Sequence, residues 1–318
     1  MSFSKDIKNE ILSKPITQDC CGLAFLSGIL SSSAFICLKG DVKVSLTTDL
    51  SNLVDYINSI IIKLYGVEVK AQVCKKYQIK KEDFYTVDIP KDLAYRLLID
   101  TGCAKIENGN LIRCFNVDEY MIKEEHCLKN FVAGVFVGCG TSSIKINNQN
   151  RLSTGYHLEF ASKNQIFLLG LKKILAQFEI YAKLIKRKNS YILYVKDANE
   201  VSNVLALIGA FNAVLMLQNE MAIREVRNKI NRQTNCISAN INKTVNASIK
   251  QNNAISLIVS KIGLEELPQD LQDVALLRMA NPEESLDELI KLASYKITKS
   301  ALNYRLNKLI KIADKLKE

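Results

Sequence analysis

Two stretches in the first two thirds of the chain, residues 23–90 and 129–197, share one pattern of apolar and polar positions. Each begins with an apolar segment rich in small residues and continues with a strand of alternating apolar and polar residues. An amphipathic helix and two basic strands complete each copy. The pattern predicts the order α-β-(β)-α-β-β twice, with the closing strands at residues 67–77 and 84–89 and at 180–186 and 191–196.

The apolar segments that open the two copies align through their phenylalanines, because Phe25 placed on Phe131 also places Gly28 on Gly134. A glycine on an apolar helix face has no Cβ and lets a second backbone approach closely. Together with Gly138, these glycines predict that the two copies dock helix against helix as a pseudo-dimer. Two ordinary core helices with incidental glycines are the alternative.

The pattern near the end of the chain predicts two capped helices. Ser285, three residues before Glu288, forms the capping-box sequence that begins a helix, so we expect a short helix at residues 286–293. Thr298 is placed to cap a further helix that runs to about residue 316. A short capped helix, a turn and a longer helix are the parts of a helix-turn-helix unit.

The longer of these two helices is amphipathic, with an apolar stripe of Leu302, Leu306, Leu309 and Ala313. Its opposite face carries cationic, amide, hydroxyl and aromatic groups, which suit phosphates and base edges. With the two capping residues, these give the candidate DNA-binding set: Ser285, Thr298, Lys299, Ser300, Asn303, Tyr304, Arg305, Asn307, Lys308 and Lys311. A solvated basic surface helix is the alternative.

Charge changes sign abruptly across this region. Residues 264–290 hold eight acids and one base, whereas residues 291–317 hold eight bases and one acid. Only the second helix of a helix-turn-helix unit must approach a polyanion, so the separation of charge favours DNA binding over a random basic surface.

A basic, asparagine-rich stretch precedes this unit, and residues 222–256 hold six bases and one acid. Asparagine and arginine can contact bases and phosphates. They serve equally well in helix caps and interdomain hydrogen bonds, so both interpretations stay open. The candidates for secondary DNA contact or interdomain bonding are Arg224, Arg227, Arg232, Asn240, Asn242, Lys243 and Asn246.

Composition narrows the functional classes further. A net charge of +10 over 318 residues indicates an acidic partner, and 48% hydrophobic residues are ordinary for a globular protein. No apolar run reaches the roughly 18 residues that a membrane span needs, and no signal-peptide pattern opens the chain. We therefore expect a cytoplasmic, nucleoid-associated protein with no membrane partner.

The cysteine pattern argues against a metal site. Nine cysteines include no CxxC pair, and the only two histidines, His126 and His157, lie far apart in sequence. Reduced thiols that pack as small apolar groups are the expected state, and neither a metal nor a cofactor is predicted.

The sequence FVAGVFVGCGT at residues 131–141 resembles the LAGLIDADG helix of homing endonucleases, and FLSGILSSSA at residues 25–34 resembles a weaker first copy. In that family the acid just before the last glycine of each motif holds the catalytic divalent metal. Cys139 and Ser33 stand at those positions here. The resemblance thus implies an inherited fold without carboxylate ligands, which Mg²⁺ prefers.

Four further stretches resemble the WhiA family of bacterial DNA-binding regulators: LIGAFN at 207–212, RNKINR at 227–232, NINKTVNA at 240–247 and TKSALNYRL at 298–306. The resemblance covers almost the whole chain. It implies a transcriptional regulator linked to cell division and chromosome segregation, and to sporulation in spore-formers. Ala301 and Tyr304 replace the expected glycine and histidine, so base preference could differ from that of relatives.

The expected fold is α+β. A degenerate LAGLIDADG pseudo-dimer of two αββαββ-like repeats, at about residues 20–95 and 127–200, occupies residues 1–218. An all-α domain resembling sigma-factor region 4 occupies residues 219–318, with its helix-turn-helix at about 285–317. The expected function is non-enzymatic, sequence-specific binding of double-stranded DNA by a monomer, with another transcription regulator or RNA polymerase as a further candidate partner.

Two other functions compete with this interpretation. One is a metal-dependent DNA endonuclease, which Ser33 and Cys139 disfavour. The other is a protein- or ligand-binding module with secondary DNA contact, built on a saddle lined by strands 67–89 and 180–196. The basic residues of that lining are Lys70, Lys75, Lys76, Lys183, Lys186, Arg187 and Lys188, and they are either a residual DNA surface or solvated strand edges.

Overall fold

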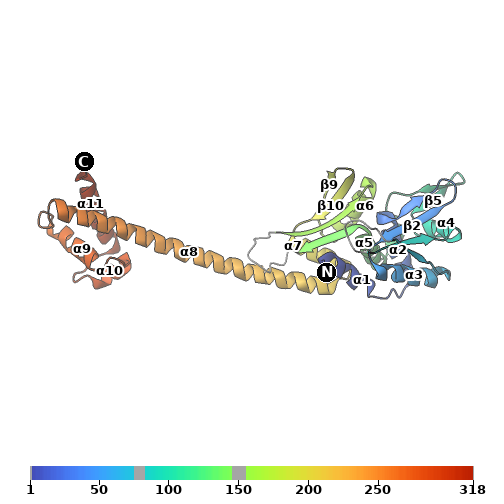
Figure 1. Cartoon of the computed structure of the whole chain (residues 1–318), viewed down its shortest axis with the longest axis horizontal. Helices are drawn as coiled ribbons and strands as arrows, with labels where there is room; N and C mark the ends of the chain where they lie inside the picture. Colours follow the sequence, from blue (N-terminus) through green and yellow to red (C-terminus); the bar gives the residue numbers. More distant parts are fainter. Residues whose placement is uncertain (1, 75–82, 145–154, 318) are drawn as a thin grey trace. The chain divides into compact units, whose positions relative to one another are not determined.

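The computed structural model describes residues 2–74, 83–144 and 155–317. The chain divides into two compact units, Met1–Ile223 and Arg224–Glu318 (Figure 1). The boundary predicted between residues 218 and 219 and this observed division both fall within helix α8 (Phe211–Lys261).

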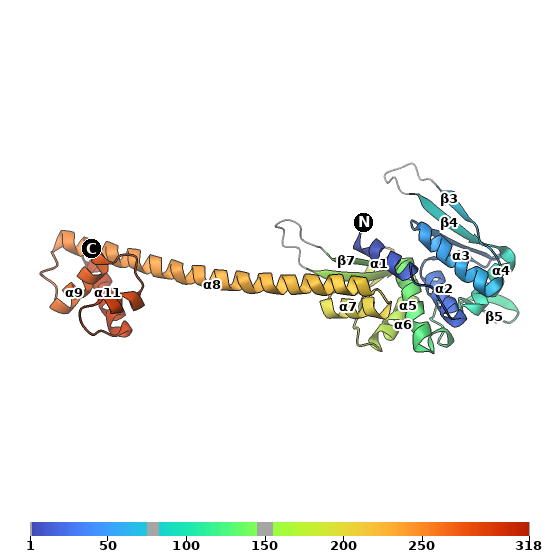
Figure 2. The same ribbon diagram turned by 90° about the horizontal axis from the view of Figure 1, so that it is seen from below.

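The first repeat of unit 1 follows the predicted order. After α1 (Phe3–Leu12) come α2 (Asp19–Ser33), β1 (Phe35–Cys37), β2 (Lys43–Thr48), α3 (Ser51–Tyr65), β3 (Ala71–Cys74) and β4 (Phe84–Ile89). The strands form an antiparallel sheet in the order β1-β2-β4-β3, and α3 packs on it (Figure 2). The predicted strand 67–77 is observed as β3, and residues 75–77 lie outside the described part of the chain.

The second repeat has the same order. It comprises α5 (Glu125–Cys139), β7 (Gly140–Ile144), β8 (Tyr156–Ser162), α6 (Gln165–Ala176), β9 (Lys183–Arg187) and β10 (Ser190–Val195), followed by α7 (Ala198–Leu207). Its sheet runs β7-β8-β10-β9, which is the first sheet repeated strand for strand. The predicted pair of αββαββ-like repeats is therefore confirmed. Between the repeats, α4 (Lys91–Asp100), the hairpin β5 (Ala104–Glu107) and β6 (Asn110–Arg113), and the short 3-10 helix η1 (Tyr120–Ile122) were not predicted.

Helices α2 and α5 pack against each other at the centre of unit 1. A methyl group on Gly28 would lie 2.2 Å from the backbone oxygen of Phe131, and one on Gly134 would lie 2.2 Å from the backbone oxygen of Phe25. The contact is reciprocal, as expected where a pseudo-twofold axis relates two helices. The glycines thus permit the predicted pseudo-dimer, and the alternative of incidental glycines is wrong.

Unit 2 is a helical domain built on its own core. The C-terminal part of α8 packs with α9 (Gln269–Ala280), α10 (Leu286–Leu292) and α11 (Lys299–Lys315). The predicted stripe of α11 is fully buried, and Ile255 and Ile258 of α8 contribute to the same apolar cluster. Both helix-turn-helix elements begin and end within a residue of their predicted bounds. Along the described ranges, no helix combines the length and apolar character needed to cross a bilayer.

Candidate nucleic-acid interface

The helix-turn-helix of unit 2 begins with the predicted capping box. The side chain of Ser285 accepts from the backbone N–H of Glu288 at 3.3 Å, and the Glu288 carboxylate accepts from the backbone N–H of Ser285 at 3.0 Å. The hydrogen bonds donated by the Ser285 hydroxyl and backbone N–H lower the pKa of Glu288. Thr298 caps α11 by accepting from the backbone N–H of Ala301. Two caps therefore set where α10 and α11 start.

Arg278 connects α9 to the segment before α10, and only 2% of its surface is exposed. Its guanidinium donates to the backbone oxygen of Glu284 at 2.7 Å and to that of Asn281 at 3.4 Å. Burial lowers the pKa of Arg278, although a guanidinium remains charged at any physiological pH. No sequence pattern distinguishes this residue from its neighbours, and its role as a buried tie was missed.

The face of α11 opposite its buried stripe is exposed. Tyr304 is 69% exposed, and Asn307 donates to Asn303 at 3.4 Å, one helical turn away. The other exposed members of the candidate set on this helix are Lys299, Ser300, Lys308 and Lys311. Side chains able to neutralise phosphates thus lie next to side chains able to donate to or accept from bases.

Two of the predicted cations also make contacts inside unit 2. The Lys299 ammonium lies 2.6 Å from the Asp287 carboxylate, and the Arg305 guanidinium lies 3.3 Å from the Asp270 carboxylate. Arg305 is only half-buried, and its ion pair joins α11 to α9. Its substitution would therefore change the packing of the domain as well as its charge.

The asparagine-rich stretch lies inside α8, where it is one continuous helix. Asn240, Asn242 and Asn246 occupy interior positions of α8, so the interpretation of these asparagines as helix caps is wrong. Of the secondary set, Arg224 is half-buried, while the rest are exposed: Arg227, Arg232, Asn240, Asn242, Lys243 and Asn246. Sequence reasoning overlooked that isoleucines and valines recur here at helical spacing.

Similarity to known proteins was found over the whole chain. The family model for the WhiA N-terminal LAGLIDADG-like domain matches residues 19–104, that for the WhiA LAGLIDADG-like domain matches residues 128–227, and that for the WhiA C-terminal HTH domain matches residues 230–313. The "Probable cell division protein WhiA" of Clostridium acetobutylicum is 35% identical over 321 residues, which cover 100% of this chain and 99% of the relative. The chain belongs to the WhiA family.

Other WhiA proteins agree with this assignment. A relative with the same name from Clostridium botulinum strain Eklund 17B is 35% identical over 322 residues, which cover 100% of this chain and 99% of the relative. The crystal structure of full-length DUF199/WhiA from Thermatoga maritima has 25% sequence identity and a TM-score of 0.58, and the match covers 99% of each chain. The fold is therefore that of WhiA: two LAGLIDADG-like units followed by a helical HTH region.

The positions that correspond to the homing-endonuclease acids lie at the ends of the two central helices of this WhiA fold. Ser33 is the last residue of α2, and its hydroxyl donates to the backbone oxygen of Ile29 at 3.0 Å. Cys139 is the last residue of α5, and desolvation raises the pKa of its thiol to about 12. Neither side chain offers an anionic oxygen at neutral pH, so the WhiA fold here lacks the ligand type that hard divalent cations prefer.

The predicted basic strands correspond to β3 and β9, which are each the last strand of their sheet. Strand β9 carries Lys183, Lys186 and Arg187, whereas β3 has no basic residue and Lys70 lies just before it. Lys70, Lys183, Lys186, Arg187 and Lys188 are exposed, whereas Lys75 and Lys76 lie outside the described residues. Lysine at a sheet edge can prevent pairing with a strand of another molecule, and its ammonium group is also accessible to an anion such as DNA. Both explanations, a solvated strand edge and a residual DNA surface, stay open.

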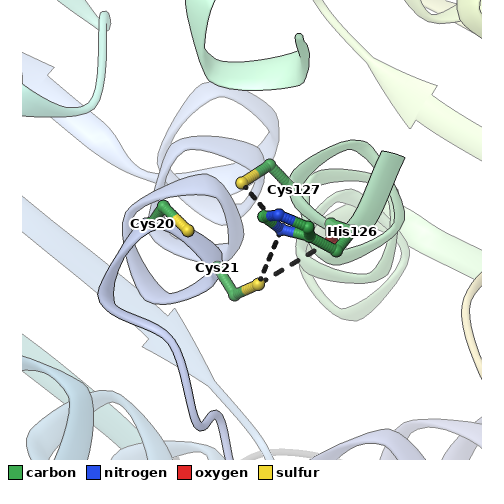
Figure 3. A group of neighbouring side chains, drawn as sticks. All are labelled: Cys20, Cys21, His126 and Cys127. Carbon is green, nitrogen blue, oxygen red and sulfur yellow. Dashed lines mark hydrogen bonds between the residues drawn. The ribbon is translucent and has the colours of Figure 1, made fainter. Parts of the chain in front are cut away.

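Unit 1 also brings together four side chains that sequence reasoning kept apart. Cys20, Cys21, His126 and Cys127 have ligand atoms within 4.8 Å of one another (Figure 3). The expectation of no metal site rested on the separation of cysteines and histidines along the chain. The packing of α2 on α5 removes that separation, and the signal was available in the alignment of the two repeats.

Proposed function

We propose that this member of the WhiA family is a non-enzymatic, sequence-specific DNA-binding regulator of transcription. In this proposal α11 enters the major groove, with its lysines at phosphates and its asparagine, serine and tyrosine side chains at base edges. The exposed basic residues of α8 add phosphate contacts. The relatives are named as cell division proteins, so we propose that the regulated processes include cell division and chromosome segregation, and sporulation where the source forms spores.

The proposal rests on the separation of apolar and polar side chains onto opposite faces of α11. One face is an apolar stripe that is at most 1% exposed, and the opposite face presents cationic and amide groups to solvent. The capped helix α10 precedes it at a helix-turn-helix spacing, and the acids of the domain are concentrated before residue 291. A helix buried on one side and basic on the other, in this order, is the arrangement that groove reading needs.

A salt titration tests the proposal. Lys308 and Lys311 are changed together to Ala, and duplex binding is measured by fluorescence anisotropy at several salt concentrations. Each lost phosphate contact should lower the slope of log affinity against log salt by about 0.9, because fewer counterions are released. The affinity itself should fall at every salt concentration.

The matched control changes Lys172 and Lys173 of α6 to Ala. Both lysines are exposed, and their substitution removes the same amount of charge from unit 1. We expect the control to keep the wild-type slope. If the α11 variant also kept the wild-type slope and affinity, the assignment of α11 as the DNA-reading helix would be wrong.

A further inference from the structure

The first turns of α2 and α5 place four potential metal ligands side by side. Asp19 begins α2 and Glu125 begins α5, and the next two residues of each helix are Cys20 and Cys21, and His126 and Cys127. The alignment that places Phe25 on Phe131 also places Cys20 on His126 and Cys21 on Cys127. The four side chains therefore come from equivalent positions of the two repeats and meet where the paired helices begin (Figure 3).

The distances within this group suit a small tetrahedral ion. The Sγ atom of Cys21 lies 3.3 Å from Nδ1 of His126, and the Sγ atom of Cys127 lies 3.2 Å from the same nitrogen. All four ligand atoms lie within 4.8 Å of one another. In a zinc tetrahedron, Zn–S bonds of about 2.3 Å and Zn–N bonds of about 2.0–2.1 Å place neighbouring ligand atoms roughly 3.5–3.8 Å apart. The observed distances of 3.2 and 3.3 Å and the upper limit of 4.8 Å bracket those values.

The chemistry of the group selects among metals. Three thiols and one imidazole are a donor set that zinc prefers, whereas Mg²⁺ and Ca²⁺ require oxygen ligands. Thiolates at helix N-termini are stabilised by the backbone dipole, and here two helices begin at the group.

Burial divides the four ligands into an inner and an outer pair. Cys21 and Cys127 are 7% and 6% exposed, whereas Cys20 and His126 are exposed. Cysteine used only for packing explains the inner pair but not the outer one, because exposed side chains do not fill a core. An outer pair in contact with solvent gives an ion a path to the inner thiols.

We propose that Cys20, Cys21, His126 and Cys127 form a structural zinc site that joins the N-terminal ends of the two pseudo-symmetric helices. With four protein ligands the site is closed, so the ion holds the repeats together and does not take part in a reaction. The glycine contacts and the metal would then fix the same helix pair at two places along its length. The inference is independent of the proposed DNA-binding function.

Metal analysis of the full-length protein tests this inference. The protein is purified under reducing conditions without a metal-affinity column, and its zinc content is measured by elemental analysis. The metal-free form is then titrated with Zn²⁺ against a chromophoric chelator, and with Co²⁺ as a spectroscopic substitute. We expect about one Zn²⁺ per chain, and cobalt spectra with thiolate charge-transfer bands and the intense visible bands of tetrahedral coordination.

Variants at the exposed ligands keep the test independent of folding. Cys20→Ser and His126→Gln change exposed side chains, so circular dichroism should match the wild-type protein. Each should weaken zinc binding by more than about 100-fold, because even the outer partners of metal ligands are typically worth 10- to 100-fold. The control Cys236→Ser removes an exposed thiol of α8 and should bind zinc like the wild type.

Two results would overturn the inference. The first is a wild-type zinc affinity no higher than that of Cys20→Ser. The second is mass spectrometry of the alkylated protein showing that the cluster cysteines form a stable disulfide after purification with reductant.

Discussion

Arg278 shows how a single buried charge can organise the helical unit 2. Its two hydrogen bonds go to backbone oxygens of the segment between α9 and α10. Both acceptors belong to half-buried residues, and a hydrogen bond from a charged donor is stronger than one between neutral groups. Arg278 therefore holds the turn from which the capping box starts α10.

Replacing Arg278 with Met should destabilise unit 2 by about 2–3 kcal/mol, because two carbonyl oxygens would lose a charged donor. Hydrogen exchange of peptides from α9 and α10, measured by mass spectrometry, reports this loss locally. The control Lys291→Met changes an exposed residue of α10 with the same loss of charge and should stay within about 0.5 kcal/mol of the wild type. Equal exchange in the two variants would show that Arg278 is not a structural tie.

Residues that act through local signals could be predicted, and residues that act through tertiary contact could not. Ser285 and Thr298 were found because a cap and its partner lie within three residues of each other. Arg278 was missed because no local pattern shows that its side chain donates to the connection between α9 and α10. The group of Cys20, Cys21, His126 and Cys127 was missed because its two halves lie on different helices, and the alignment of the repeats is the sequence signal that relates them.

At the scale of elements, the packing of α2 against α5 depends on the absence of two side chains. The atoms nearest to a Cβ on Gly28 are the backbone oxygen of Phe131 at 2.2 Å and the backbone nitrogen of Val135 at 2.9 Å. Backbone atoms in the middle of a buried helix cannot yield as a side-chain tip can. A single added methyl group must therefore move one helix away from the other.

Gly28→Ala should destabilise unit 1 by about 2–3 kcal/mol, since overpacking a closely fitted contact typically costs 1–3 kcal/mol. Gly22→Ala is the matched control on the same helix, because its added methyl group meets the Ile60 side chain at 3.1 Å, which can shift. Thermal unfolding followed by circular dichroism should separate the two variants. If Gly28→Ala unfolded at the wild-type temperature, the two helices would have to pack differently from the structure.

The elements themselves were mostly foreseeable, because each repeat carries its own periodicity and the second copy checks the first. The two sheets have the same order of strands, as expected for two copies of one repeat. The middle of α8 was not predicted as a helix, because its asparagines and arginines were interpreted as contact or capping residues and the spacing of Ile230, Ile237 and Ile241 was overlooked. Apolar residues at a period near 3.6 are the primary sequence evidence for a helix.

At the scale of the whole molecule, the two units differ in the chemistry that their side chains offer. Unit 1 has the LAGLIDADG-like fold but carries Ser33 and Cys139 where homing endonucleases carry acids. Unit 2 presents the exposed basic and amide face of α11. Both features could be predicted from the sequence. The first depends on which residues stand at two motif positions, and the second on the helical spacing of residues 299–315.

The division predicts that the protein binds DNA without cutting it. Supercoiled plasmid incubated with the full-length protein and Mg²⁺ or Mn²⁺ should stay supercoiled on an agarose gel, because no carboxylate at position 33 or 139 can hold a hard cation beside the phosphate that is cleaved. Cys139→Ala gives the decisive control. Cleavage that persists in this variant would not depend on the Cys139 thiol, and it would contradict the prediction if it still copurified with the protein through further chromatography. Cleavage that the variant abolishes would mean that the thiol, despite its raised pKa, serves a reaction for which the motif no longer provides acids.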